Sequence, residues 1–272
     1  MTLTVGLALL TLGLVIGALG TIIGVGSGWL HVPLLMILFK FSPQDAIGTS
    51  LGVISMNTMA GSFLYAMQKK IDFNFAKRLA LAALPGATVG PFIVRQYTAT
   101  GFSLAFSLFL FFLAYYLHSM RDWVFNTSHV VLKDKMSLTM ANGKTIKYST
   151  NIEVGVIGTF IIGFLSNLLG IGGGVIHVPF LITLLRVPPH VAVATSHFIL
   201  FISSTIGTLI FILMGHVSLD FMMAIGIGTI LGAIIGAGLS SKISDKGIRT
   251  ILAAVVTVVA IHMLYTSIFG GP

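Results

Sequence analysis

Two glycine-rich segments, 146 residues apart, constrain this chain more than any other feature. Residues 24–33 read GVGSGWLHVP and residues 170–179 read GIGGGVIHVP. In the windows 24–36 and 170–182, seven of thirteen positions are identical, among them three glycines, a histidine and a proline. Glycines at every second position interrupt a helix, because they destabilise its interior and admit positive φ. A polar break of this kind, duplicated inside apolar sequence, predicts a binding site.

The surrounding sequence is that of a polytopic membrane protein. Of its 272 residues, 56% are hydrophobic and 8% charged, and the mean hydropathy is +1.04. Crossing a hydrocarbon core takes about 20 helical residues, and several uncharged stretches reach that length. The apolar runs are continuous rather than alternating, so we expect an all-α fold. The expected helices are residues 45–67, 75–94, 101–118, 190–214, 219–240 and 247–269, and the expected broken units, a helix before and a short helix after each break, are 3–39 and 152–185.

The duplication extends over nearly the whole chain. At the same offset Pro43 matches Pro189, and no gap is needed to align the two halves. Such a repeat divides the protein into a first transmembrane repeat at residues 1–118, a linker at residues 119–150 and a second transmembrane repeat at residues 151–272.

The linker is polar and is expected to lie outside the membrane. Asn142 and Gly143 form a dipeptide typical of a tight hairpin turn. Apolar residues alternate on each side of it, at Leu138, Met140, Ile146 and Tyr148. This pattern predicts a small β-hairpin.

Charge placement favours one topology over another. If each Gly-rich break is the tip of a re-entrant hairpin, thirteen of the fifteen Lys and Arg residues share the face of the linker, and only Lys40 and Arg95 lie opposite. If each broken unit crosses the membrane once, the split is nine to six. Basic residues collect on the cytoplasmic side. The count therefore predicts two inverted-topology repeats, each with a broken re-entrant helix pair plus three transmembrane helices, a cytoplasmic linker and periplasmic termini.

Two re-entrant hairpins that enter from opposite faces bring their tips together near the midplane, where inverted-repeat transporters bind substrate. The short helix after each break points its N-terminus there, with free N–H groups and about half a positive charge. Glycine also lets the backbone approach a ligand closely. This arrangement suits a small anion. The substrate-binding candidates in the two segments are Gly24, Gly26, Ser27, Gly28, Gly170, Gly172, Gly173 and Gly174.

Polar side chains near the two segments are further candidates. His31 and His177 lie in the first turn of each short helix, where a neutral imidazole could donate to an oxyanion or carry a proton. A bond to a neighbouring carbonyl or hydroxyl group is an equally good reading. The other candidates are Thr49, Ser50, Asn57, Asn167, Thr195, Ser196 and His197. For any one hydroxyl or amide, bonding within the helix bundle is the more frequent role, although the matched recurrence of the Thr-Ser pairs raises the chance of substrate contact.

Glycines spaced four apart are a separate group. Pairs such as Gly13/Gly17 and Gly86/Gly90 predict close helix packing rather than a site. The stripe from Gly228 to Gly236 fits packing either within one chain or between two copies in a homodimer.

Several function classes find no residues to support them. All seven acidic residues fall at expected helix ends or in the linker, which weighs against a cation pump. Cysteine is absent, so disulfides and thiolate metal sites are excluded. No metal-ligand pair, catalytic motif, cofactor fingerprint or nucleic-acid motif is found. We therefore expect no enzyme activity, cofactor, metal or nucleic-acid partner, and the charge of +8 fits membrane topology instead.

The duplicated Gly-Ile-Gly-Gly-Gly-x-x-x-Val-Pro pattern at residues 170–179 and 24–33, with Ala-x-x-Thr-Ser elements at 46–50 and 192–196, resembles the sulfite exporter TauE/SafE family, also grouped as four-toluene-sulfonate uptake permeases. The resemblance covers nearly the whole chain. It implies transport of sulfite, sulfoacetate or other organosulfonates across the bacterial inner membrane. One departure is Ser27, which stands where the second segment has Gly173.

The leading hypothesis is a secondary transporter in the inner membrane that moves a small sulfur-containing anion by alternating access. Its partners would be that anion and the lipid bilayer. The alternative is a non-transporting membrane protein that senses an anion or assists maturation of a partner through the linker. Which anion is moved, in which direction, and with which coupling ion are left open by the sequence.

Overall fold

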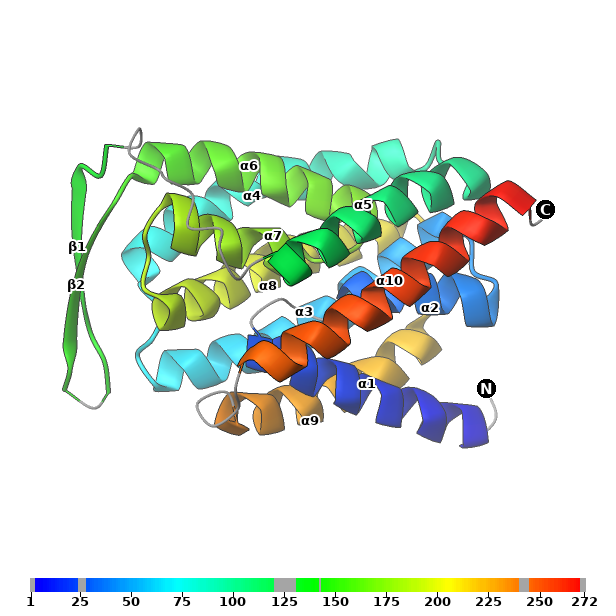
Figure 1. The fold of residues 1–272 in the computed structure, drawn as a ribbon, viewed down its shortest axis with the longest axis horizontal. Coiled ribbons are helices and arrows are strands. Elements are labelled where there is room, and N and C mark those ends of the chain that lie inside the picture. The colour runs from blue at the N-terminus through cyan, green and yellow to red at the C-terminus, as the bar shows by residue number, and fades with distance from the viewer. Residues whose placement is uncertain (1–2, 24–27, 120–130, 142, 240–244, 270–272) are drawn as a thin grey trace.

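The computed structural model describes residues 3–23, 28–119, 131–141, 143–239 and 245–269, and most of them are helical (Figure 1). The elements of the first half are α1 (Leu3–Ile23), α2 (Gly28–Phe39), α3 (Pro43–Met67), α4 (Phe73–Val94) and α5 (Ala99–Ser119). The linker forms β1 (Asp134–Thr139) and β2 (Thr145–Thr150). The second half contains α6 (Ile152–Leu169), α7 (Gly174–Pro179), η1 (Phe180–Leu184), α8 (Pro189–Leu213), α9 (Leu219–Leu239) and α10 (Asp245–Phe269). Four helices in the described part of the chain, α1, α6, α8 and α9, contain windows long and apolar enough to cross a membrane.

The helix positions predicted from sequence are confirmed to within about two residues, and local capping explains the ends. The Ser42 side chain accepts from the Asp45 N–H, with Pro43 in the first turn of α3, where its missing N–H costs nothing. Asn151 caps α6 in the same way by accepting from Val154. One element differs from the prediction. The expected helix at 175–185 divides into α7 and the π-helical turn η1 directly after Pro179, whose ring obstructs regular helical bonding.

Helices α3 and α8 form the centre of the bundle and run antiparallel. Gly48 near the start of α3 lies against Phe211 near the end of α8, whereas Gly61 lies against His197 near the start of α8. Between these contacts the hydroxyl groups of Ser55 and Thr205 are 2.6 Å apart. These two helices, which align at the offset of 146 residues, therefore run in opposite directions.

The flanking helices pair across the two halves. α1 packs along α9, and α4, which matches α9, packs along α6, which matches α1. Likewise α3 contacts α9 and α8 contacts α4, while α5 packs on its counterpart α10. In Figure 1, α1 starts at the end of the molecule marked N, whereas its counterpart α6 starts at the opposite end beside the hairpin. Each of these contacts between a helix of the first half and a helix of the second half thus has a counterpart between the two matching helices.

Glycines spaced four apart make these helix contacts, as the sequence predicts. A methyl group added at Gly17 would lie 2.6 Å from the Cα of Thr229 on α9. One added at Gly86 would meet the backbone nitrogen of Phe164 on α6 and lie 2.6 Å from its Cα, closer than real Cβ atoms approach. The stripe Gly228, Gly232 and Gly236 packs on the backbone of α1. The stripe is therefore used within the chain.

The predicted hairpin is confirmed, and it lies across one end of the helix bundle (Figure 1). Its strands are antiparallel, with Leu138 opposite Ile146 and Met136 opposite Tyr148. The inner face packs on the cluster around Phe75 and Leu79. The hydroxyl group of Tyr148 donates a 2.8 Å hydrogen bond to the buried carboxylate of Asp72. The hairpin is thus bonded to the N-cap residue of α4.

Candidate functional site

The second Gly-rich segment reverses the chain direction. Gly170, Gly172 and Gly173 have φ values of 67°, 73° and 70°, a conformation that costs an L-residue roughly 1–2 kcal/mol. The helix that follows runs back along α6. The Thr159 hydroxyl on α6 lies 2.9 Å from Nε2 of His177, and further from the turn Gly155 lies beside Leu185. The chain therefore leaves this unit at the end where it entered.

The two Gly-rich segments meet. Gly28 begins α2, and a methyl group added there would lie 2.6 Å from the carbonyl oxygen of Ile171. A methyl group added at Gly170 would lie 3.0 Å from Cγ2 of Val32 on α2. A Cβ at Gly28 would clash with the Ile171 backbone, and one at Gly170 would be both tightly packed and strained by the φ of 67°. Gly24, Gly26 and Ser27 lie outside the described residues.

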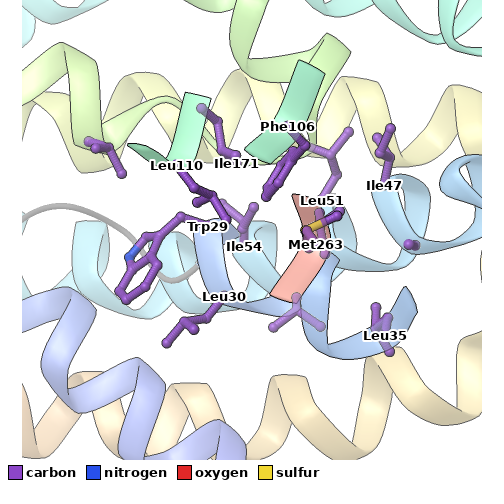
Figure 2. Packing of buried hydrophobic residues seen from close by; sticks show 14 of the residues in the cluster. Trp29, Leu30, Leu35, Ile47, Leu51, Ile54, Phe106, Leu110, Ile171 and Met263 are labelled. Atoms are coloured by element: carbon purple, nitrogen blue, oxygen red, sulfur yellow. The ribbon is translucent and has the colours of Figure 1, made fainter. Parts of the chain in front are cut away.

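Helix α3 lies beside this meeting point. The Ser50 hydroxyl donates a 2.8 Å hydrogen bond to the carbonyl oxygen of Gly170. One turn on, the Ile54 side chain lies against both Gly28 and Gly172. Trp29, Ile54 and Ile171 belong to one buried cluster (Figure 2). The second Gly-rich segment is thus held on α3 by one polar bond and by close apolar packing.

The other hydroxyl and amide candidates are spread over several helices. Thr49 accepts a 3.0 Å bond from the backbone N–H of Ser218, in the connection between α8 and α9. Asn57 is fully buried on α3. Thr195 and Ser196 are fully buried on α8, and their hydroxyl groups have no hydrogen-bond partner among the described residues.

The three candidate histidines, His31, His177 and His197, are all buried but differ in their hydrogen-bond partners. Nε2 of His177 meets the Thr159 hydroxyl, and Nδ1 of His197 lies 3.0 Å from the carbonyl oxygen of Val193. Neither ring nitrogen of His31 has a partner within the described part of the chain. At the offset of 146 residues the position that matches Thr159 is Gly13, which has no side chain to offer a histidine. Of these three histidines, His31 is therefore the one with both ring nitrogens available to a ligand.

Two consecutive polar residues near the end of α6 contact different neighbours. Asn167 donates from Nδ2 to the carbonyl oxygen of Gly163, at 2.8 Å, and its Oδ1 is buried without a partner among the described residues. Ser166 lies at the N-terminus of α7, with its Oγ 2.9 Å from the Cβ position of Gly173. Ser166 and Ile54 are not among the residues predicted from sequence. Both belong to ordinary helix sequence, which carries no signal for this contact.

Charged side chains are excluded from this part of the bundle. Across the residues that the structure describes, no Lys, Arg or Glu is buried, and the buried Asp72 lies at the end covered by the hairpin. The same residues include no group of three or more His, Asp or Glu placed to hold a metal ion. An anion at the meeting point would therefore be held by uncharged donors: backbone N–H groups at a helix N-terminus, hydroxyls and an imidazole.

Comparison with known proteins gives consistent matches. The family model described as Sulfite exporter TauE/SafE matches residues 9–263. The probable membrane transporter protein YunE of Bacillus subtilis is 32% identical over 255 residues, covering 91% of this chain and 93% of that protein. A probable membrane transporter protein of Methanocaldococcus jannaschii is 27% identical over 256 residues, covering 89% and 88%. Sulfite exporter TauE/SafE family protein 5 of Arabidopsis thaliana is 27% identical over 131 residues, covering 47% and 29%. No solved structure matches.

Proposed function

Because the chain belongs to the sulfite exporter TauE/SafE family of membrane transporters, we propose that it moves a small sulfur-containing anion, such as sulfite, sulfoacetate or another organosulfonate, across the cell membrane. It works as a secondary transporter by alternating access. The anion binds where the two Gly-rich segments meet, and no catalysis or cofactor is needed.

The observation that carries this proposal is the contact between Gly28 and Ile171, which brings the two segments together beside Ser50. Each helix N-terminus contributes about half a positive charge. The buried donors around them are uncharged, so their strength depends on the exclusion of water, which makes each interaction stronger than in solution. In the described structure the two segments touch, so entry of an anion requires them to separate.

Two observations support an inverted-repeat arrangement in the membrane. The matched helices α3 and α8 run antiparallel, with Gly48 beside Phe211 and Gly61 beside His197. The helical unit after the second Gly-rich segment runs back along α6, so that Leu185 returns to Gly155. Opposed, matched units around one site allow the site to open to each side of the membrane in turn.

The direct test is uptake of labelled sulfite and alkanesulfonates into proteoliposomes. Gly173→Leu should abolish uptake, because Gly173 has a φ of 70° and the Ser166 side chain fills the space that a larger residue would need. Gly215→Leu is the matched control, since Gly215 has a φ of 78° but nothing within 4 Å of its Cβ position. Uptake should survive in this control. If the unaltered protein moved none of these anions, the proposed function would be wrong.

A role in partner binding would use the outer face of the hairpin. There Lys135, Lys147, Ser137 and Ser149 line a shallow hollow of about 300 Å³. The inner face already packs on the protein's own helices. Charge reversal at Lys135 and Lys147 should leave anion uptake unchanged if the hairpin is peripheral to transport. The same change should abolish the activity of the protein in the cell if a partner docked there is essential.

A further inference from the structure

One side chain contacts glycines of both Gly-rich segments. Ile54 is fully buried on α3. A methyl group added at Gly172 would lie 2.8 Å from its Cγ2 and 3.0 Å from its Cδ1. A methyl group added at Gly28 would meet the same Cδ1. Ile54 therefore occupies the space where the first and second segments approach each other.

Ile54 lies on the same face of α3 as the polar residue Ser50. Ser50, one turn before, bonds to the carbonyl oxygen of Gly170, and residues four apart lie on one face of a helix. An anion that reaches the backbone N–H groups of the second segment from this side must therefore pass or contact the Ile54 side chain. On this face of α3, the Ile54 side chain is the apolar boundary of the proposed site.

The Ile54 side chain is also poorly able to move aside. A β-branched residue in a helix has one strongly preferred χ1 rotamer. Its neighbours Leu51 and Ile171 are fully buried in the same cluster, and close-packed interiors leave little room for a second rotamer. The space beside it is consequently set by the size of this side chain.

We propose that Ile54 determines the largest organic group that the transporter accepts, admitting inorganic sulfur oxyanions and short alkanesulfonates while excluding arenesulfonates. This inference rests on the proposed function and assigns a substrate size limit to the same site. The sulfonate group would face the backbone N–H donors, and the organic group would face Ile54. In a hydrophobic pocket, a difference of one methylene group changes selectivity by about 10-fold to 200-fold.

The test uses methanesulfonate, propanesulfonate and benzenesulfonate, which carry the same singly charged head group and differ in size. Initial uptake rates are measured in proteoliposomes holding the unaltered protein, Ile54→Ala, Ile54→Phe or Leu79→Ala. Leu79 is the matched control, because it is equally buried but belongs to the separate cluster around Phe75. The readout is the rate for benzenesulfonate divided by that for methanesulfonate, which does not depend on how much protein is active.

We expect Ile54→Ala to raise this ratio at least about tenfold and Ile54→Phe to lower the ratio of propanesulfonate to methanesulfonate, while Leu79→Ala keeps both ratios. Unchanged ratios in both Ile54 variants, with uptake retained, would overturn the size limit and leave the proposed function intact. An equal shift in Leu79→Ala would also overturn it, since general loosening would then be the cause. Absence of all uptake by the unaltered protein would instead overturn the proposed function.

Discussion

The hydroxyl group of Ser50 donates a 2.8 Å hydrogen bond to the carbonyl oxygen of Gly170, across 120 residues of sequence. It joins α3 of the first repeat to the turn that ends α6 in the second. Gly170 has a left-handed backbone, and Ser50 is fully buried. The carbonyl therefore has no access to water, and the turn depends on this side chain for its orientation.

Ser50→Ala should destabilise the protein by about 1–3 kcal/mol, because it leaves a buried carbonyl group unsatisfied. Ser196 is the matched residue in the second repeat, and its hydroxyl has no partner among the described residues. Ser196→Ala should thus cost much less stability, although we expect it to slow uptake if the hydroxyl contacts substrate. Thermal unfolding in detergent, followed by uptake assays, separates the two effects. Equal losses of stability would contradict the assigned bond.

Gly172→Ala should destabilise the second Gly-rich segment for two reasons. The residue has a φ of 73°, and all three of the nearest atoms to its Cβ position belong to the Ile54 side chain. Combining it with Ile54→Ala should remove the steric part and leave the backbone strain. A double-mutant cycle in thermal unfolding should therefore give a coupling of about 0.5–3 kcal/mol, the range for residues in contact. Additive effects would show that the two residues do not touch.

The parts of the structure that follow local rules could be predicted from the sequence. Apolar length, Pro43 at a helix start and the alternating residues of the hairpin strands are read from neighbouring residues, and the repeat aligns the halves. Asn142 of the predicted turn lies outside the described residues. The partners of individual side chains could not be predicted, since they depend on how distant helices pack. The imidazole of His177 meets the Thr159 hydroxyl, whereas neither ring nitrogen of His31 has a partner among the described residues, and the position that matches Thr159 is Gly13. Ile54 looks like any lipid-facing or core residue until α3 is placed beside both Gly-rich segments.

The hydrogen bond between Tyr148 and Asp72 should make the docking of the hairpin weaken at strongly alkaline pH. Burial, and then the neighbouring Asp72 carboxylate, raise the pKa of the Tyr148 hydroxyl above its ordinary value of about 10. The pKa of Tyr148 is thus higher in the folded protein than in the unfolded chain. The stability that the Tyr148 hydrogen bond contributes is therefore complete below about pH 10 and is lost as the pH rises through the folded-state pKa.

A spectrophotometric titration of the unaltered protein minus Tyr148→Phe reports the ionisation of this one tyrosine. Asp72→Asn should lower its pKa while keeping an acceptor for the Phe75 N–H that Asp72 now caps. An ordinary tyrosine titration in the unaltered protein would be inconsistent with the buried bond.

Gly232→Val should destabilise the pairing of α1 with α9. The Cβ position of Gly232 meets the carbonyl oxygen of Leu14 and lies 2.6 Å from the backbone nitrogen of Ala18. Overpacking of this kind typically costs about 1–3 kcal/mol. Leu231→Ala, on the neighbouring exposed position, is the control and should change thermal unfolding little. If Gly232→Val instead altered only the oligomeric state, the stripe would act between chains.

Cysteine labelling can decide how the repeats are oriented, because the chain contains no cysteine of its own. In the inverted arrangement Lys147→Cys in the hairpin and Arg186→Cys after η1 should both be labelled from the cytoplasmic side, and Thr4→Cys from the periplasmic side. The physical reason is that η1 runs back along α6, so that residue 185 returns to the level of Gly155 near the hairpin. A membrane-impermeant thiol reagent, applied to spheroplasts and to inverted vesicles, distinguishes the faces. If each broken unit instead crossed the membrane once, Arg186→Cys and Lys147→Cys would react from opposite sides, and Thr4→Cys would share the face of Lys147→Cys.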